Sequence, residues 1–363
     1  MSMQIVLQNV SKTPLFAHIT GTADKGLCYL SADGQPVYPS NPAATMQPVQ
    51  DSAISIAANA SKTITIPRIA GGRIWFSQET PLKFFVNPGT NGPALVEPSA
   101  TNTADQNYKQ DWGFCEFTFN QYEAYINVSY VDFVSLPIAL KLENESGQTK
   151  SVAGMPNDGL QKVAAGLTAQ GGDWAKLVVQ ESGKLLRVLS PNAGSVLYPD
   201  FLKGYYTDYV NECWAKYEKE DLTVNTQFKW GDAKGRVTNG ILDFGDAGKF
   251  AKPVERDIWS CNSGPFDHGG ASDEQLNIGA RIAAALNRST LDKNSVQPNG
   301  EKVDEYYKES VTNHYARVCH EVAVEGRGYA FAYDDVGADG GKDQSGFVND
   351  PKPKVLTVTV GGV

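Results

Sequence analysis

The sequence predicts a mainly β fold with an α+β lobe that contains the helices. Up to about residue 150, short alternating apolar runs are separated by Gly, Pro, Asn and Asp, a pattern typical of a β-sandwich or barrel. From residue 158 the apolar residues recur at helical spacing instead. The closing segment KVLTVTVGG predicts a strand again. We therefore expect the end of the chain to rejoin the first sheet, with the helical lobe inserted between.

Residues 1-150 are expected to form the β-sandwich or barrel domain. Its predicted strands are QIVLQNV, LFAHITG, TITIPRI, RIWFS and KFFVN, followed by a hairpin within residues 114–140. Trp75 in RIWFS alternates like a core residue, so we expect a structural role for it. Residues 87–109 are rich in Asn, Pro and Thr without periodicity, which predicts a long surface loop.

The first strand of the hairpin, FCEFTFN, carries polar residues at alternate positions. Successive side chains of a strand point to opposite faces, so Glu116, Thr118 and Asn120 share one face. The residues between them are Cys and Phe, an apolar row that would pack against a core. This strand is therefore expected to present Glu116 on the side away from the core.

The return strand brings a second carboxylate, Asp132. If the turn centres near Ala124, Asp132 lies nearly opposite Glu116 on the same face. Glycoside hydrolysis uses two carboxyl groups, one to protonate the leaving oxygen and one to activate water or attack the sugar. Burial and a neighbouring carboxylate both disfavour charge, so one of the two would keep its proton and serve as the acid. The alternative is that both are solvated residues on the exposed face of a sheet.

Residues 151-325 are expected to form the helix-rich α/β lobe. Helices are predicted at residues 160–167, in FLKGYYTDYVNECWAKYEKE, in ASDEQLNIGARIAAALNRST with Ser272 or Asp273 as N-cap, and in DEYYKESVTNHYARVCHEVAV. TVNTQFKWG and GRVTNGILDFG predict a further hairpin between them. Residues 326-363, with YAFAYDD and KVLTVTVGG, are expected to return as strands to the β-domain.

Several segments resemble glycoside hydrolase family 64, the laminaripentaose-producing endo-β-1,3-glucanases. The most specific are CEFTFN, INVSYVDFVSLPIAL and GRGYAFAYDDVG; PLFAHITG, YLSADGQPVYP and IPRIAGGRIWFS agree with the family in the same order. The resemblance spans most of the chain. It implies a thaumatin-like β-domain, a helix-containing second domain and a wide groove between them. It also implies an inverting endo-β-1,3-glucanase that releases pentasaccharide-type products and needs no cofactor.

The resemblance assigns roles to residues of the hairpin. It makes Glu116 the general acid and Asp132 the general base, and it places Thr118 and Asn120 where sugar hydroxyls are bound. Directly opposed strand residues have Cβ atoms about 5 Å apart. Inverting pairs are typically about 6.5–9.5 Å apart. The expectation of inversion therefore rests on the resemblance and not on the predicted hairpin.

Further substrate-binding candidates lie outside this strand. Trp112 and Tyr125 flank the hairpin and are expected to stack on glucose rings. Asp334 and Asp335 match the acidic block of the family and are candidates for sugar binding, although an Asp-Asp before a Gly-rich loop is also a common turn former. His268 lies in the Gly-rich loop CNSGPFDHGG, where it either approaches a ligand or is a satisfied loop histidine.

Composition excludes several classes of partner. With 32 Lys and Arg against 41 Asp and Glu, the net charge of −9 disfavours nucleic acid and anionic lipid, whereas a neutral β-1,3-glucan meets no such penalty. No segment approaches the ~18 apolar residues of a membrane span. MSMQIVLQNVSKTP lacks the pattern of a signal peptide. The family implies an extracellular protein, a location inside the cell stays open, and we expect a monomer.

The sequence contains no recognisable pattern for a metal or a nucleotide. The run DDVGADGGKD lacks the spacing and the distal Glu of an EF-hand, which leaves calcium as a minor alternative. Of the five cysteines at least one must stay unpaired, and Cys261 with Cys319 is the expected bridge. The remaining alternatives for function are a non-catalytic thaumatin-like β-glucan-binding or defence protein, and a hydrolase for a different polysaccharide.

Overall fold

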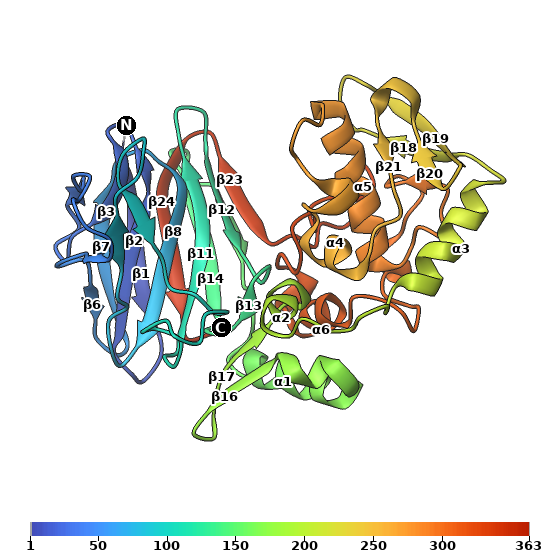
Figure 1. Ribbon diagram of the computed structural model, residues 1–363. Coiled ribbons are helices and arrows are strands. Elements are labelled where there is room, and N and C mark those ends of the chain that lie inside the picture. Colours follow the sequence, from blue (N-terminus) through green and yellow to red (C-terminus); the bar gives the residue numbers. More distant parts are fainter. Residues whose placement is uncertain (1, 363) are drawn as a thin grey trace.

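The computed structural model describes residues 2–362 and consists of two lobes (Figure 1). The β-lobe contains two stacked sheets and includes strands from both ends of the chain. The other lobe contains the helices and a smaller sheet. The mainly β fold class predicted from the alternating runs is confirmed.

A five-stranded sheet forms the outer layer of the β-lobe. In spatial order it consists of β15 (Thr149–Val152), β14 (Ile138–Asn144), β24 (Pro353–Val360), β1 (Met3–Asn9) and β7 (Ala60–Ile66). The last strand, β24, runs parallel to β1 and antiparallel to β14, so the C-terminal segment rejoins the first sheet as KVLTVTVGG predicts. Alternate residues of β1 are buried, which is the expected pattern for a strand with one face on the core.

An eight-stranded sheet packs against this layer and carries the predicted hairpin. Its order is β23 (Phe347–Asp350), β12 (Ala124–Val128), β11 (Trp112–Phe119), β8 (Ile69–Gln78), β2 (Leu15–Ala23), β3 (Gly26–Leu30) and β4 (Pro36–Val37), with β6 (Ile54–Ile56) paired to β2. Apolar residues from the inner faces of both sheets belong to one core cluster. Strand β23 forms the edge nearest the helical lobe (Figure 1).

The remaining elements lie mostly in the helical lobe. Its sheet consists of β21 (Lys249–Phe250), β20 (Ile241–Asp243), β19 (Asp232–Thr238), β18 (Leu222–Asn225) and β22 (Val296–Gln297). The α-helices are α1 (Gly159–Gln170), α2 (Pro191–Leu197), α3 (Thr207–Tyr217), α4 (Glu255–Ser260), α5 (Asp273–Arg288) and α6 (His314–Val322). Short 3-10 turns are η1 (Gly172–Leu177), η2 (Gly245–Ala247), η3 (Gly264–Phe266), η4 (Val303–Glu305) and η5 (Val324–Gly326). Two small sheets complete the fold, β10 (Ala94–Val96) with β9 (Phe85–Asn87) and β5 (Gln47–Pro48), and β13 (Phe133–Val134) with β17 (Lys184–Leu189) and β16 (Val178–Glu181).

Helix α5 illustrates how the second lobe follows from its sequence. Ser272 is the N-cap, and its Oγ accepts a hydrogen bond from the backbone N–H of Gln275 at 3.1 Å. Ile278, Ile282 and Leu286 lie at helical spacing and are fully buried. The predicted helix, its start and its apolar stripe are therefore confirmed. The predicted hairpin is present too, because β18 and β19 pair antiparallel.

The register of the hairpin differs from the prediction. Glu116 pairs with Asn127, and the turn spans residues 120–123 and not Ala124. The cause is Asn120, whose Oδ1 accepts from the backbone N–H groups of Tyr122 and Glu123 at 2.7 and 3.1 Å and so closes a tight turn early. Strand β12 ends at Val128. Asp132 therefore lies beyond the strand and does not face Glu116 across the hairpin.

Three further expectations are wrong. YAFAYDD forms no strand beyond a single bridge between Tyr329 and Ser129; the neighbouring edge strand is β23. The loop at residues 87–109 is interrupted by β10, which pairs with β9. Cys261 and Cys319 form no disulfide, because all five cysteines are buried separately as free thiols. In the core they behave as small apolar residues.

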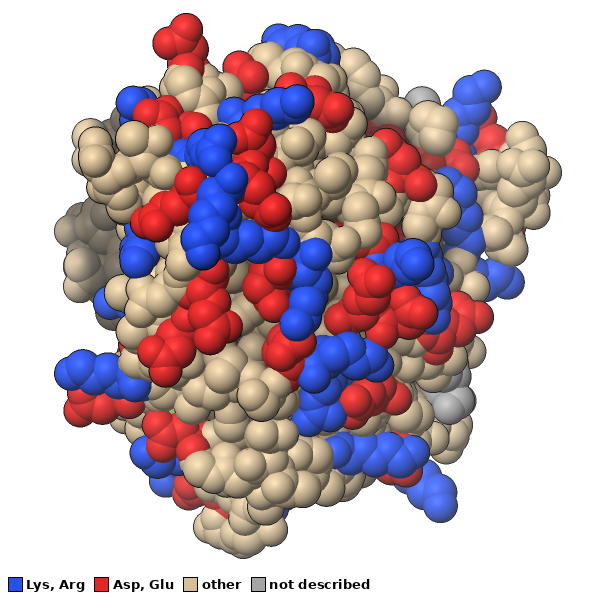
Figure 2. Space-filling model, turned by 90° about the vertical axis from the view of Figure 1, so that its right-hand side faces the viewer, with Lys and Arg blue, Asp and Glu red and all other residues tan. Residues whose placement is uncertain are grey.

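The face of the molecule on the side of the helical lobe carries mixed charge (Figure 2). Figure 2 shows the side of the helical lobe, where acidic and basic side chains alternate without a large region of one sign. Within residues 2–362, the helices are all too short or too polar to cross a lipid bilayer.

The small sheet β13–β17–β16 joins the two lobes. Its strand β13 follows the hairpin of the β-lobe, and Phe133 of β13 pairs with Leu189 of β17.

Candidate active site

A row of polar residues crosses the centre of the eight-stranded sheet. Strand β11 lies between β8 and β12, and Glu116 is the direct partner of Arg73 on one side and Asn127 on the other. Side chains of such cross-strand partners lie about 5 Å apart at Cβ and therefore touch. The row forms the floor of a hollow of about 440 Å³, which Glu97, Thr118 and Tyr125 also line.

Strand alternation explains why Glu116 reaches this hollow. Cys115, Phe117 and Phe119 are buried, whereas Glu116 and Thr118 are only partly buried. The predicted two-faced strand is thus confirmed for these residues.

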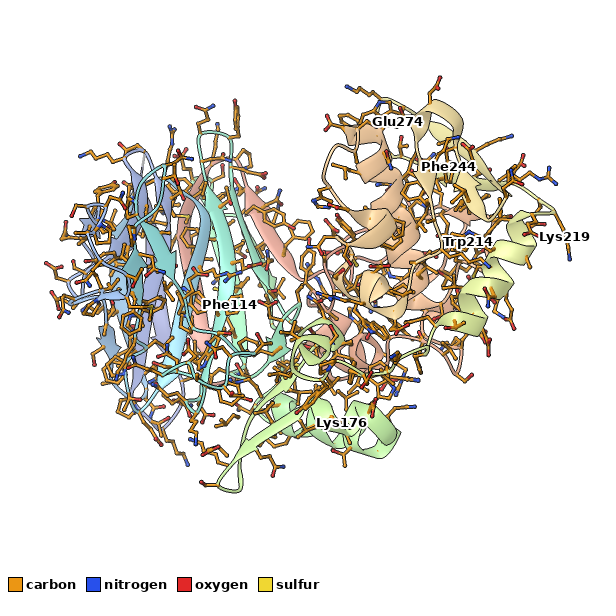
Figure 3. The ribbon with its side chains drawn as sticks, viewed as in Figure 1. Phe114, Lys176, Trp214, Lys219, Phe244 and Glu274 are labelled. Carbon is orange, nitrogen blue, oxygen red and sulfur yellow. The ribbon has the colours of Figure 1, made fainter. Side chains whose placement is uncertain are left out.

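Arg73 holds Glu116 in place. Its Nε and Nη2 both lie 3.2 Å from Glu116 Oε1, and its Nη1 lies 2.8 Å from Glu97 Oε2. The guanidinium also stacks 4.7 Å above the ring of Phe114, which Figure 3 labels on the sheet. Arg73 is fixed by its ion pair with Glu97 and by its contact with the aromatic ring. It therefore holds the Glu116 carboxylate in one position.

Asp132 approaches the same arginine from a different segment. It lies between β12 and β13, and the backbone N–H of Ser190 donates to its carbonyl oxygen at 2.9 Å. Ser190 is also the N-cap of α2, so the start of this helix fixes the backbone at Asp132. Asp132 lines a second hollow of about 230 Å³ between the sheet and α2, and Arg73 lines it too.

The surroundings raise the pKa of both carboxyl groups above the ordinary range. For Glu116 burial is the main cause; the positive charge of Arg73 opposes it, and the negative charges of Asp132 and Glu97 add to it. For Asp132 burial raises the pKa and Arg73 again opposes this. Each group is therefore able to hold or accept a proton nearer to neutral pH than a solvated carboxylate.

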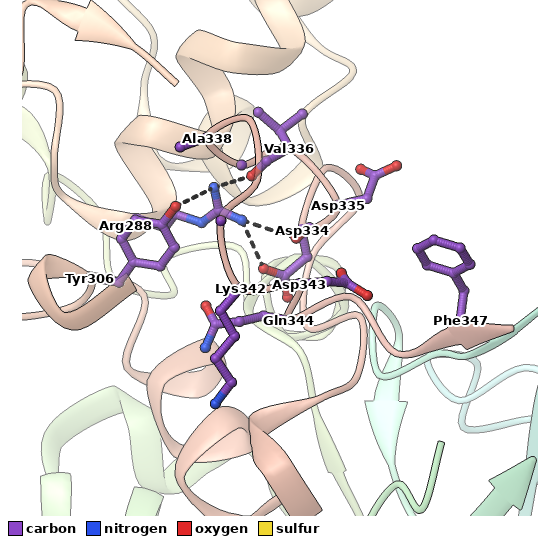
Figure 4. A pocket seen from close by; sticks show the side chains of 12 residues that line it. Arg288, Tyr306, Asp334, Asp335, Val336, Ala338, Lys342, Asp343, Gln344 and Phe347 are labelled. Atoms are coloured by element: carbon purple, nitrogen blue, oxygen red, sulfur yellow. Dashed lines mark hydrogen bonds and ion pairs between the residues drawn. The ribbon is translucent and has the colours of Figure 1, made fainter. Parts of the chain in front are cut away.

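A third hollow continues this surface toward the helical lobe. Tyr125 of the first hollow stacks on Phe347 with ring centroids 4.9 Å apart and an interplanar angle of 18°. Phe347 in turn lines a hollow of about 270 Å³ with Asp335, Lys342 and Asp343 (Figure 4). The second and first hollows share Arg73, and Tyr125 of the first contacts Phe347 of the third, so the three are neighbours. We call this series of hollows, from α2 across β11 to the segment at residues 334–344, the groove.

Of the predicted binding residues, Thr118, Tyr125 and Asp335 line this groove. Asn120 does not, because its side-chain oxygen closes the hairpin turn. Trp112 borders the second hollow but is only 1% exposed, since its ring packs against Phe133 and its Nε1 donates to the carbonyl of Asn107. Its expected stacking on a sugar is therefore wrong.

Asp334 and His268 also differ from the expectation, although Asp334 is one of the residues that line the third hollow. Asp334 is 2% exposed, and its carboxylate accepts hydrogen bonds from Arg288, His320 and the backbone N–H of Ala330. Both oxygens of its carboxylate therefore already accept hydrogen bonds from the protein. The predicted sugar-binding role of Asp334 is corrected to a structural one. His268 lies outside the three hollows, where its Nε2 contacts the hydroxyl of Tyr333 at 3.1 Å.

Sequence reasoning missed Arg73, Glu97 and Asn127. Nothing in the local pattern marks Arg73, which is 43 residues from Glu116 and meets it only through strand pairing. Asn127 Oδ1 is buried and has no hydrogen-bond partner within residues 2–362. A buried amide oxygen without a partner is costly, and Asn127 lines the same hollow as Glu116.

The acidic run near residue 339 binds protein donors. Asp339 accepts hydrogen bonds from Gln227 and Asn299 at 2.7 and 2.9 Å. In the described part of the chain, no three His, Cys, Asp or Glu side chains are grouped as a metal site.

A family model described as β-1,3-glucanase, glycoside hydrolase family 64, matches residues 1–360. Among curated relatives, glucan endo-1,3-beta-glucosidases from Cellulosimicrobium cellulans and from Arthrobacter sp. (strain YCWD3) are each 28% identical over 82% of this chain. The match covers 53% of each relative, so the chain spans about half their length.

Solved structures agree with this match. A laminaripentaose-producing β-1,3-glucanase in complex with laminaritetraose has a TM-score of 0.88 and 30% identity, covering 99% of this chain and 98% of that one. A family 64 β-1,3-glucanase domain from Clostridium beijerinckii shares the fold, with a TM-score of 0.75 at 21% identity and coverage of 99% and 98%. The resemblance inferred from the motifs is confirmed, while the thaumatin-like affiliation stays a prediction. The chain belongs to glycoside hydrolase family 64, the β-1,3-glucanases.

Proposed function

We propose that this protein is an endo-acting β-1,3-glucan hydrolase. The observation that carries the proposal is the position of Glu116 and Asp132 in adjoining hollows on either side of Arg73. Two carboxyl groups with raised pKa values beside an open groove match the requirements of glycoside hydrolysis. Family membership and the printed activity of the relatives support β-1,3-glucan as the substrate.

In the proposed mechanism Glu116 is the general acid. Its protonated carboxyl donates to the glycosidic oxygen as the bond from that oxygen to the anomeric carbon breaks. Asp132 is the general base: it removes a proton from a water molecule, whose oxygen attacks the anomeric carbon from the opposite face. The leaving sugar departs with the proton of Glu116, and the proton of water stays on Asp132.

Attack from the opposite face inverts the anomeric configuration. The observed register supports this outcome. Directly opposed strand residues have Cβ atoms about 5 Å apart, but Asp132 is not the cross-strand partner of Glu116, so their separation is not held to that distance. An inverting pair needs a wider gap that admits a water molecule. The separate hollows lined by the two carboxyl groups provide for such a gap.

The groove supplies groups for sugar binding. Thr118, Asn127 and Asp335 offer hydrogen-bonding atoms for hydroxyls, and Tyr125 with Phe347 offers aromatic surface. An open groove admits the middle of a polymer, whereas a closed pocket would admit only chain ends. This supports endo cleavage into short oligosaccharides.

The direct test is incubation with laminarin or curdlan, with products followed by reducing-sugar assay and NMR. We expect soluble oligosaccharides whose new reducing ends first appear in the α configuration and then mutarotate. Early β anomers would contradict inversion while leaving hydrolysis in place. Binding without any product would instead favour the non-catalytic glucan-binding alternative.

We further propose that Glu97 sets the pH range of the reaction. The charged groups that face Glu116 are Arg73, Glu97 and Asp132, and Glu97 offsets the positive charge of Arg73. Glu97→Gln keeps the shape of the side chain but removes its negative charge. The positive charge of Arg73 then acts more strongly on Glu116, so the pKa of Glu116 falls. Since the acid must be protonated, the alkaline limb of the kcat/KM profile is expected to move down by about half to one pH unit. An unmoved or upward-shifted limb would contradict this role.

Location and assembly follow as proposals from the same substrate. We propose an extracellular protein, because a glucan polymer does not cross membranes. We also propose that the protein is a monomer. Light scattering at micromolar concentration tests the second statement, and a dimer mass would overturn it.

A further inference from the structure

Two aromatic residues, the exposed Phe228 and the half-buried Trp230, lie on the loop at residues 226–231 between β18 and β19 of the helical lobe. Phe228 is 60% exposed, and its ring centroid lies 5.0 Å from that of Trp230. The ammonium group of Lys229 lies 5.7 and 5.1 Å from the two ring centroids. Single exposed apolar residues are ordinary. A pair of rings held together with a cation is a more specific arrangement.

The loop that carries the pair is rigidly built. The backbone N–H and the hydroxyl of Thr226 both donate to the carbonyl of Gly231, at 2.9 and 2.8 Å, and Gly231 N–H donates back to Phe228 at 3.0 Å. Gly231 has a φ of +67°, which glycine adopts without strain. The rings are thus presented on a closed loop, which lowers the entropy lost when a ligand binds.

A glutamine connects this loop to the groove. Gln227 Oε1 accepts from Arg281 at 2.9 Å, and its Nε2 donates to the carbonyl of Gly337 and to Asp339 at 2.9 and 2.7 Å. Gly337 and the adjacent Ala338 line the third hollow, shown in Figure 4. The loop that carries the aromatic pair is therefore tied through Gln227 to the wall of the third hollow, at the end of the groove farthest from α2.

We infer that Phe228 and Trp230 form an outlying binding platform for the glucan chain. The inference rests on the proposed function. It extends the surface that binds the glucan chain beyond the third hollow. Flat aromatic faces suit the C–H faces of pyranose rings, and this contact needs no charge on the ligand. A platform outside the catalytic pair would hold the polymer while its middle is cleaved.

The platform is tested with Phe228→Ala/Trp230→Ala in the whole protein, using insoluble β-1,3-glucan particles in a depletion assay. We expect affinity for the particles to fall about tenfold, which corresponds to about 1.4 kcal/mol. The loss in kcat/KM on laminarihexaose should be smaller, because a short chain held at Glu116 does not extend to the loop. Phe228→Tyr, which keeps an aromatic face, should retain most of the affinity.

Tyr38→Ala is the matched control. Lys25 lies 5.3 Å from the centroid of Tyr38, a similar aromatic and lysine pair that follows β4 at the opposite edge of the sheet from β23. Its binding should equal that of the unmodified protein, and thermal unfolding should show all variants folded. Undiminished particle binding by the double variant overturns the platform, even if hydrolysis of laminarin stands. Loss of binding to anionic vesicles alone would also overturn it, in favour of a lipid contact. An unmodified protein that neither binds nor hydrolyses glucan would defeat the proposed function itself.

Discussion

Glu116→Gln is expected to lower kcat/KM on laminarin by about 10²- to 10⁴-fold, the usual contribution of a general acid. Gln preserves the size of the side chain and can still contact Arg73, but it has no proton to give to the glycosidic oxygen. Because the loss concerns the transition state, binding of the polymer should be nearly retained. Steady-state kinetics and a depletion assay measure the two effects separately.

A synthetic substrate distinguishes an acid from a residue that only shapes the site. The substrate is an aryl β-glycoside of a β-1,3-linked glucose oligosaccharide, in which the aryl group is a strongly acidic phenol. The phenolate leaves without being protonated, so Glu116→Gln should lose much less activity on this substrate than on laminarin. Glu123→Gln is the control, since Glu123 lies in the same hairpin, contacts Asn349 and lines none of the three hollows. Equal losses on both substrates would remove Glu116 from the acid role.

Asp334→Asn is expected to lower the free energy of unfolding by about 3–5 kcal/mol, because the buried guanidinium of Arg288 loses its nearer carboxylate and keeps only the weaker contact with Glu301 at 3.9 Å. Arg288 Nη2 lies 3.2 Å from Asp334 Oδ1, and the side chains are 1% and 0% exposed. His320 Nε2 lies 2.9 Å from the other carboxylate oxygen. Urea unfolding followed by fluorescence measures the change.

The pH dependence provides a second check on Asp334. Burial alone would raise its pKa, but the charge and hydrogen bond of His320, together with Arg288, outweigh burial and hold the pKa below the ordinary range. The stability that Asp334 contributes is therefore present above the carboxyl pKa of the unfolded chain and lost as pH falls through the folded value. Asp334→Asn should flatten this acid-side loss.

An exposed ion pair is the control for this prediction. Arg317 and Glu321 lie one helical turn apart on α6, with an N–O distance of 2.9 Å and Glu321 58% exposed. Glu321→Gln should cost no more than about 0.5 kcal/mol. A cost below about 1 kcal/mol for Asp334→Asn would show that the buried cluster tolerates the loss of one charge.

Local patterns predicted much of the fold correctly. The alternating pattern of FCEFTFN correctly predicted that Glu116 and Thr118 lie on the strand face opposite a buried row of Cys and Phe. Ser272 and the stripe from Ile278 predicted α5 with its start. These features depend on residues a few positions apart, whose relative directions follow directly from strand and helix geometry.

Errors arose where one polar side chain competed with a periodic pattern. Asn120 was assigned to the sugar-binding face, yet its oxygen caps the backbone of the next residues and ends β11. This shifted the register, and with it the expected partner of Glu116. The resemblance to the family makes Asp334 a sugar-binding candidate, whereas Arg288 and His320 from two helices occupy its carboxylate oxygens at the edge of the third hollow.

The amino-acid pattern was sufficient to predict the β character of the chain, the direction in which Glu116 points, the helix that begins after Ser272 and the family to which the protein belongs. Tertiary contacts were needed to show that Arg73 and Glu97 hold Glu116, that Asp132 lies beside α2, and that Gln227 ties its loop to the wall of the third hollow. The physical reason is the range of the forces involved. Side-chain direction follows from the backbone within one element, whereas charge pairing and groove formation depend on strand register and lobe packing between segments tens to hundreds of residues apart.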